Sequence, residues 1–136
     1  MKIYTSYYSK VSDLRQNEIE PVCISAGAPD FFKGLTYRKL APKKDMLYGK
    51  MTDAEYRVAY AEILSKLEPQ KVVQELTEIA GGKNIALCCY EGTKKLETSF
   101  CHRQIVAKWL WDTLKIEVEE FDTKRHGLMK QQNLFD

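Results

Sequence analysis

The sequence predicts a three-layer α/β sandwich with a mostly parallel central sheet, Rossmann-like in its layering. Two observations predict this class. Apolar, strand-like segments alternate along the chain with segments of helical periodicity. The segment Ile85–Tyr90 (IALCCY) is almost wholly apolar, which is typical of a central strand covered on both faces. We therefore expect helices on both sides of the sheet.

Four other segments are candidate strands. Residues 2–8 are rich in Tyr and Thr and predict the first strand. Residues 20–25 have a continuous apolar centre and predict the second. Residues 35–40 fit either a short strand or an extended loop. Residues 116–121 (IEVEEF) alternate apolar and acidic side chains, which favours a half-solvated edge strand.

The helices are predicted by caps and periodicity. Residues 11–17 are expected to form a short helix or turn, and residues 42–47 a helical turn. Residues 52–67 give the clearest helix, because Thr52 and Glu55 have the spacing of a capping box. Its apolar stripe is typical of core rather than of a ligand site and comprises Tyr56, Tyr60, Ile63 and Leu67.

A further helix begins at Pro69, a residue favoured at the first helical position, and ends at Gly81-Gly82. The residues expected to be buried on it are Val72, Val73, Leu76, Ile79 and Ala80. A last helix begins near Cys101. Its inner side is expected to contain Ile105, Val106, Trp109, Leu110 and Leu114.

The composition indicates one soluble domain over residues 1–121, followed by a polar tail over residues 122–136. The chain has 136 residues, of which 44% are hydrophobic and 29% charged, enough for one buried core. The net charge of +2 permits nucleic acid as a partner but does not require it. No apolar run approaches the ~20 residues of a membrane span, so no membrane partner is expected.

The first ten residues (MKIYTSYYSK) lack the apolar region of a signal peptide, so we predict a cytoplasmic protein. In a reducing compartment the four cysteines are expected to be free thiols, catalytic groups or ligands rather than disulfides. No phosphate-binding loop, nucleophile elbow or zincin motif is present, and no cofactor is predicted.

The candidate site lies where the strand ending near Cys89 and Glu91 meets the helix that begins near Cys101. With Ser99 as the cap, Cys101 falls in the first turn, where unpaired backbone amides stabilise a thiolate or an anion. Cys89 and Glu91 leave a strand on the same face, whereas Cys88 points to the other face and is expected to be core. His126 is expected to be solvated.

Three uses of this cluster remain open. In the first, Cys101 is a thiolate nucleophile, His102 and Glu91 are its acid/base partners, and Arg103 binds an anion. The second is a metal site of Cys89, Cys101 and His102, with or without Glu91, although the spacing is not that of a zinc finger. The third is structural, with an Arg103–Glu91 salt bridge that joins helix to strand.

These residues also resemble a known family. The segment ALCCYE followed by FCHRQIVAKWL is similar to the hallmark of the domain of unknown function 488 family, a Cys-x-Glu strand end and then a Cys-His-Arg helix start. The resemblance extends upstream through YTSYYSKV, PVCISAGAP and RKLAPKKDML and covers most of residues 1–121. It implies a compact α/β sandwich with Cys89, Glu91, Cys101, His102 and Arg103 at one site.

Two features depart from that family pattern. The loop between the motifs, GTKKLETSF, is long, and the segment SAGAPDF lacks the Arg that many members have after the second strand. If that Arg binds an anion in relatives, this chain does not supply it there. The family name itself implies no reaction.

The chain ends in QQNLFD, which is similar to the Gln-x-x-Leu-Phe motif that binds the bacterial sliding clamp. Gln131 would make a polar anchor, and Leu134 and Phe135 would enter an apolar pocket. The alternative is that Leu134 and Phe135 fold back on the domain itself.

The sequence therefore predicts a protein that acts on DNA, nucleotides or another phosphorylated ligand and is recruited to the sliding clamp. Cys101, Glu91 and His102 are the predicted catalytic residues, and Arg103 and Cys89 the binding residues. The alternatives are a non-enzymatic adaptor with a structural cluster, and a thiol redox protein that uses Cys89 and Cys101.

Overall fold

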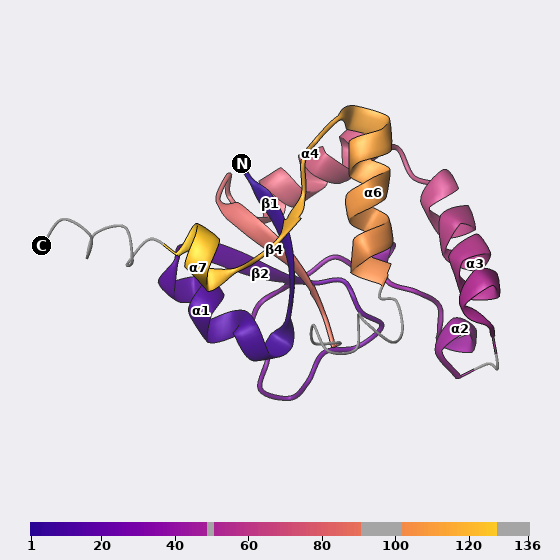
Figure 1. Ribbon diagram of the computed structural model, residues 1–136, viewed down its shortest axis with the longest axis horizontal. Coiled ribbons are helices and arrows are strands. Elements are labelled where there is room, and N and C mark those ends of the chain that lie inside the picture. The colour runs from indigo at the N-terminus through magenta and orange to yellow at the C-terminus, as the bar shows by residue number, and fades with distance from the viewer. Residues whose placement is uncertain (49–50, 91–101, 128–136) are drawn as a thin grey trace, which may run out of the picture.

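The computed structural model describes residues 1–48, 51–90 and 102–127. Helices lie on both faces of a single sheet, as Figure 1 shows. In chain order the elements are β1 (Ile3–Tyr7), η1 (Tyr8–Lys10), α1 (Val11–Gln16), β2 (Ile19–Cys23), β3 (Leu35–Thr36), η2 (Arg38–Leu40), α2 (Lys44–Tyr48), α3 (Asp53–Ser65), α4 (Pro69–Ile79), β4 (Asn84–Cys89), α6 (His102–Leu114), β5 (Glu119–Glu120) and α7 (Thr123–His126).

The sheet has the strand order β3-β2-β4-β1-β5, and every described pair of strands is parallel. β4 lies between β1 and β2, with Cys88 opposite Ser6 and Cys23, and Cys89 opposite Tyr7. The three-layer α/β sandwich and the central position of residues 85–90 are therefore confirmed. Because the strands are parallel, their carboxyl ends all reach the same edge.

The two faces of the sheet have separate cores. One contains Ile85 and Leu87 of β4 and packs against α3, α4 and α6. The other contains Ala86 and Cys88 of the same strand and packs against α1. Figure 1 shows α1 and α7 on one side of the strands, with α4 and α6 on the other and α3 outside α6. The two-residue periodicity of β4 thus divides one apolar strand between two cores.

The local signals predicted several boundaries correctly. Thr52 caps α3, its hydroxyl accepting from the Glu55 amide at 3.1 Å, and the Glu55 carboxylate accepts from the Thr52 amide at the same distance. α4 begins at Pro69, and Gly81 and Gly82 follow it with φ values of 62° and 80°. Glycine is favoured there because a side chain strains a backbone with positive φ.

Three expectations differ from the structure. Ile79 is 41% exposed because it ends α4 away from the sheet. The edge strand has two paired residues, Glu119 and Glu120, in place of six. The first part of the expected tail forms α7, and His126 is not solvated: its side chain is 8% exposed, its Nε2 lies 2.8 Å from Glu119 Oε2, and its ring contacts Tyr4 and Phe121.

Candidate functional site at the carboxyl edge of the sheet

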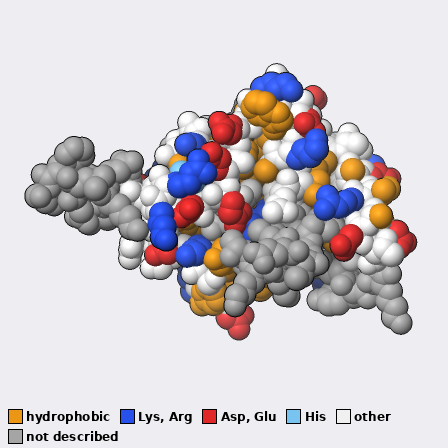
Figure 2. Space-filling model, in the orientation of Figure 1, with side chains coloured by type: hydrophobic (Ala, Val, Ile, Leu, Met, Phe, Trp, Pro, Cys, Tyr) orange, Lys and Arg blue, Asp and Glu red, His pale blue; other side chains and the backbone are white. Residues whose placement is uncertain are grey.

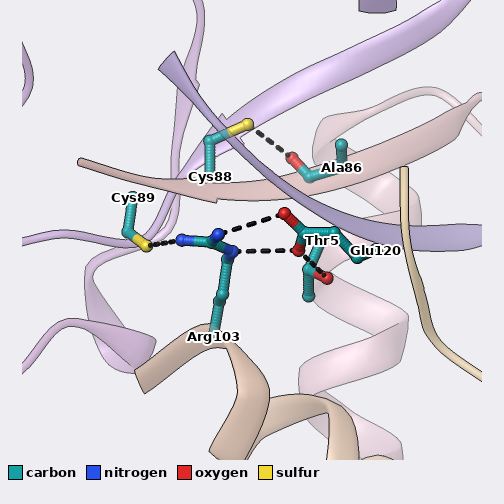
Figure 3. Close-up of polar contacts among 6 residues, drawn as sticks. All are labelled: Thr5, Ala86, Cys88, Cys89, Arg103 and Glu120. Carbon is teal, nitrogen blue, oxygen red and sulfur yellow. Dashed lines mark hydrogen bonds and ion pairs between the residues drawn. The ribbon is translucent and has the colours of Figure 1, made fainter. Parts of the chain in front are cut away.

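The candidate site is built around Arg103 in the first turn described for α6. α6 packs against β1 and β4, and this places its first turn beside the carboxyl ends of these strands. The Arg103 side chain is fully buried, yet it extends between two strands rather than into the apolar core. Figure 3 shows its guanidinium between Cys89 of β4 and Glu120 of β5.

Each guanidinium nitrogen donates to one of these two neighbours. Nε lies 3.0 Å from Oε1 of Glu120, and Nη2 lies 3.0 Å from Oε2. Nη1 lies 2.8 Å from Sγ of Cys89. A paired, planar contact of this kind fixes the orientation of both groups more strongly than a single ion pair would. Arg103 therefore joins α6, β4 and β5.

Glu120 has a buried side and an open side. Thr5 Oγ1 of β1 donates to its Oε1 at 2.7 Å, so one carboxylate oxygen accepts from both Thr5 and Arg103. The Tyr7 ring lies 5.7 Å from Cζ of Arg103 and adds a cation–π contact. The Glu120 side chain is nevertheless 30% exposed. The buried charge is thus neutralised by a carboxylate that solvent can still reach.

A hollow of about 460 Å³ opens beside Glu120. Its lining includes Tyr7, Lys10, Glu120, Lys124 and Arg125. Figure 2 shows Lys and Arg side chains interspersed with acidic ones over this part of the surface, around α7. In this lining the three cations Lys10, Lys124 and Arg125 outnumber the two carboxylates, Glu120 and Asp122, which favours a polar, anionic ligand over an apolar one.

The two adjacent cysteines of β4 point in opposite directions (Figure 3). Cys88 is fully buried on the α1 face, and its thiol contacts the Ala86 carbonyl oxygen at 3.5 Å. Burial raises the pKa of the Cys88 thiol to about 12. Cys89 is 1% exposed, receives the guanidinium on the α6 face and is disulfide-bonded. The expectation that the cysteines are not in disulfides is therefore wrong for Cys89, whereas Cys23 and Cys88 are free thiols. The prediction that Cys88 is a core residue is confirmed.

His102 lies in the core beside Arg103. Its Nε2 is 2.8 Å from the Ile24 carbonyl oxygen, so this nitrogen carries the proton that the carbonyl accepts. The ring is 5% exposed and meets the Tyr60 ring edge-on at 5.4 Å. These contacts tie the start of α6 to the residue that follows β2.

A second polar cluster lies at the same edge on the α1 face. The Tyr8 hydroxyl donates to Cys23 Sγ at 2.9 Å and lies 2.5 Å from Ser25 Oγ, which in turn donates to the Gly27 carbonyl. Burial and the Cys23 contact raise the pKa of Tyr8 well above its ordinary value. This cluster is hydrogen-bonded and neutral, with no ion pair among its described members.

Comparison with known proteins supplies the family. The family model described as "Active DUF488-N3 subclade" matches residues 25–114, more than half of the chain. The chain belongs to the DUF488 family. The match contains the two motifs that suggested the resemblance. No curated protein and no solved structure matches the chain.

Within this DUF488 domain, two of the predicted site residues are in contact, Cys89 and Arg103, whereas the His102 ring is directed to the Ile24 carbonyl oxygen. The other predicted positions fall outside the described residues: Glu91, Cys101, Gln131, Leu134 and Phe135. Their roles stay predictions. The partner expected for Arg103 in the structural alternative was Glu91, whereas the carboxylate that the described residues place against it is Glu120.

Sequence reasoning missed Glu120 and Thr5, although a signal for Glu120 was present. In IEVEEF, residues 116, 118 and 120 share one face of an extended chain, and 117, 119 and 121 share the other. Glu120 therefore lies on the same inward face as Ile116 and Val118, where the alternating pattern predicts an apolar residue. An acidic residue on an inward face predicts a buried cation opposite it. Thr5 carries no comparable signal.

The described residues lack a metal-binding cluster and a membrane-spanning helix. No group of three or more His, Cys, Asp or Glu side chains there could hold a metal ion. No helix in the described ranges is long and apolar enough to cross a membrane.

Proposed function

We propose that this DUF488 protein binds and acts on a phosphorylated ligand, such as DNA or a nucleotide, at the carboxyl edge of its sheet. Cys101 would be the nucleophile, with Glu91 and His102 as its acid/base partners. The observation that carries the proposal is the Arg103–Glu120 pair beneath a hollow bordered by Lys10, Lys124 and Arg125. In open parallel sheets this edge is where ligands bind.

The Arg103 contacts support a positioning role within that site. Arg103 follows Cys101 by two residues, and its guanidinium fixes the start of α6 to β4 and β5. A fixed helix start is the arrangement that a thiolate in the first turn requires. The Lys and Arg side chains around the hollow supply the positive charge that a phosphate needs.

The alkylation rate of Cys101, followed from pH 5 to 9 by peptide mapping, tests the nucleophile. We expect a midpoint clearly below the ordinary cysteine pKa of about 8.5. Added nucleotide or oligonucleotide should slow the reaction. The urea-unfolded protein gives the reference profile. A native profile that matches this reference, unchanged by ligand, would contradict the proposal.

Recruitment to the bacterial sliding clamp is the second part of the proposal, and it depends on Gln131, Leu134 and Phe135. α7 docks on the domain through His126, so the motif follows a fixed point of the surface after only a few residues. Full-length protein should bind a sliding clamp, and Leu134→Ala and Phe135→Ala should each abolish binding. Asn133→Ala is the matched control, because the motif leaves this position open. Equal binding by all four proteins, or by none, would rule out the motif.

A non-enzymatic adaptor is the second candidate, and the saturation of the described cluster favours it. Arg103 donates to Glu120 and Cys89, and His102 donates to Ile24, which are contacts typical of a structural cluster. An adaptor predicts that Cys101→Ser keeps partner binding and any cellular phenotype. Loss of the phenotype with retained clamp binding would favour the enzyme.

A thiol redox role for Cys89 and Cys101 is supported by the disulfide bond of Cys89 and by the donation from Arg103 to its Sγ. A guanidinium beside a sulfur stabilises the thiolate that disulfide exchange releases. Peptide mapping without reductant should then recover a Cys89–Cys101 disulfide that titrates with a glutathione buffer. Absence of this disulfide under all oxidising conditions would exclude the role.

A further inference from the structure

A cluster of aromatic side chains lies on the α1 side of the carboxyl edge, away from the Arg103 site. It comprises Tyr8 after β1, Phe31 and Phe32 after β2, and Tyr90 after β4. Phe31 is 65% exposed and Tyr90 is 54% exposed. We call these four residues the aromatic surface. Neither core accounts for two large rings this exposed at one edge.

The aromatic surface has a rigid base. Tyr8 is 3% exposed, and its hydroxyl is held by Cys23 and Ser25. Its ring meets Phe32 at 5.1 Å and Tyr90 at 5.0 Å, both edge to face. Such contacts fix the inclination of the rings. The rings of Phe32 and Tyr90 are therefore supported on a side chain that cannot move independently of the sheet.

A hollow of about 550 Å³ lies beside these rings. Its lining combines rings, hydroxyls, an amide and a guanidinium and consists of Tyr8, Ser9, Val11, Ser12, Arg15, Gln16 and Phe31. The Arg15 guanidinium donates to the Lys33 carbonyl oxygen, which holds it at the border of the hollow. Figure 1 shows the loop that follows β2 passing close to the start of α1, where this hollow lies.

The charges at the border favour an anionic partner. Arg15 lines the hollow, the carbonyl that it contacts belongs to the exposed Lys33, and the acidic residue nearest in sequence to Phe31 is Asp30. Ring faces and cations together are the pattern of single-stranded nucleic-acid sites, where bases stack and phosphates meet Arg or Lys. Ser12 and Gln16 add groups that can bond to base edges. An extended peptide without acidic groups would use the rings but would gain nothing from the cations.

We propose that the aromatic surface and its hollow bind single-stranded nucleic acid, with a base against Phe31 or Tyr90 and a phosphate at Arg15. The inference rests on the proposed function in one respect, because it names nucleic acid as the phosphorylated ligand. Its geometry is independent of Cys101, since the surface lies on the opposite face of the sheet from Arg103.

The test is fluorescence anisotropy of a labelled twelve-nucleotide oligothymidylate with the full-length protein. Phe31→Ala and Tyr90→Ala should each weaken binding roughly 5- to 160-fold, which corresponds to the range of about 1–3 kcal/mol for loss of one stacked base. Arg15→Gln should lower the slope of log Kd against log salt by about 1. Asp30→Asn should tighten binding by removing a like charge from the phosphate path.

Trp111→Ala is the matched control. Trp111 is 49% exposed and its ring lies 5.3 Å from Lys115 Nζ, so it also combines an exposed ring with a cation, but on α6. Binding should not change. The inference is overturned if Phe31→Ala and Tyr90→Ala bind the oligonucleotide as the unmodified protein does, or if Trp111→Ala loses as much affinity for it as they do. It is also overturned if a proline-rich peptide binds this surface and the oligonucleotide does not.

The Cys101 alkylation profile separates failure of this inference from failure of the proposed function. Phe31→Ala removes a ring on the far side of the sheet, so it should leave the alkylation profile of Cys101 without ligand unchanged. If Phe31→Ala and Tyr90→Ala weaken oligonucleotide binding while the Cys101 profile matches that of the unfolded protein, the inference stands and the proposed nucleophile fails. If the Cys101 profile is shifted but both variants bind as the unmodified protein does, the inference is overturned and the proposed function stands.

Discussion

On the α6 face of the sheet the polar groups at the carboxyl edge form an ion pair, whereas on the α1 face they form a neutral hydrogen-bonded cluster. The Arg103 guanidinium and the Glu120 carboxylate meet on the first face. The Tyr8 and Ser25 hydroxyls meet with Cys23 Sγ on the second. The two clusters are separated only by the thickness of the sheet, so strand parity alone divides them.

This contrast shows how one strand can give two neighbouring cysteines different chemistry. Cys88 faces apolar side chains and its pKa is raised to about 12, so it stays a thiol. Cys89, the next residue, lies against a guanidinium. The neutral cluster around Tyr8 stabilises the fold and carries no charge that would attract an anion. The Arg103–Glu120 pair also stabilises the fold, but its solvent-accessible carboxylate can interact with a bound ligand.

Loss of Arg103 should give the largest effect. Arg103→Met keeps the volume but leaves Glu120 without its cation and Cys89 without its donor. We expect a loss of about 3 kcal/mol in the free energy of unfolding, measured by urea titration. Arg103→Lys keeps the charge without the paired geometry and should lose less. If both variants are as stable as the unmodified protein, the ion pair does not join the three elements.

The pH dependence of Cys88 should come second. Its folded pKa is raised, so its contribution to stability is complete below the unfolded cysteine pKa of about 8.5 and is lost as pH rises toward 12. At pH 10 the loss is about 2 kcal/mol. In urea titrations, the Cys88→Ala variant should have a lower free energy of unfolding at pH 7. Between pH 8.5 and 10.5 this free energy should fall less with pH than it does in the unmodified protein. Parallel pH curves for the two proteins would show that Cys88 does not titrate this way.

Tyr8→Phe tests the neutral cluster and should cost about 1 kcal/mol, the typical worth of a buried hydrogen bond. The ring remains, so Phe32 and Tyr90 keep their edge-to-face contacts. Thermal unfolding at pH 7 measures the change. A loss as large as that of Arg103→Met would remove the distinction between the two faces.

Glu119 tests a partly exposed carboxylate, hydrogen-bonded by His126 and close to Arg125, against the buried Arg103–Glu120 pair. The hydrogen bond from His126, with the nearby Arg125, holds the pKa of Glu119 below its usual range. Its contribution is therefore complete above the unfolded Glu pKa of about 4.3 and is lost as pH falls through the lower folded value. Glu119→Gln should flatten the stability curve between pH 5 and 3 with little effect at high salt. An unchanged acid limb would mean that α7 is held by its rings alone.

The smallest effect is expected at Glu18, which follows the end of α1 with a φ of 61°. A side chain costs about 1 kcal/mol in this left-handed conformation, but glycine loses more entropy on folding. Glu18→Gly should therefore gain only a few tenths of a kcal/mol. Thermal unfolding against the unmodified protein measures it, and a clear loss would indicate a missed contact of Glu18.

The fold was largely predictable because it depends on patterns that are local in sequence. The capping box at Thr52 and the apolar run over residues 85–90 correctly predicted α3 and the central strand. The site was less predictable because its decisive contact joins residues 17 apart, Arg103 and Glu120. Their pairing depends on β5 lying beside β1, which no local pattern specifies. α7 was missed for the same reason, since His126 is buried by Tyr4 and Phe121 from elsewhere in the chain.

β5 pairs with β1 through only two residues, so main-chain hydrogen bonds hold this edge strand weakly. Its second residue, Glu120, accepts from the same guanidinium that donates to Cys89. A change in the bonding of the Cys89 sulfur alters one of the two acceptors of Arg103 and therefore changes how strongly Arg103 binds the other acceptor, Glu120. The stability of β5, and of α7 after it, thereby depends on the chemical state of a sulfur on the central strand.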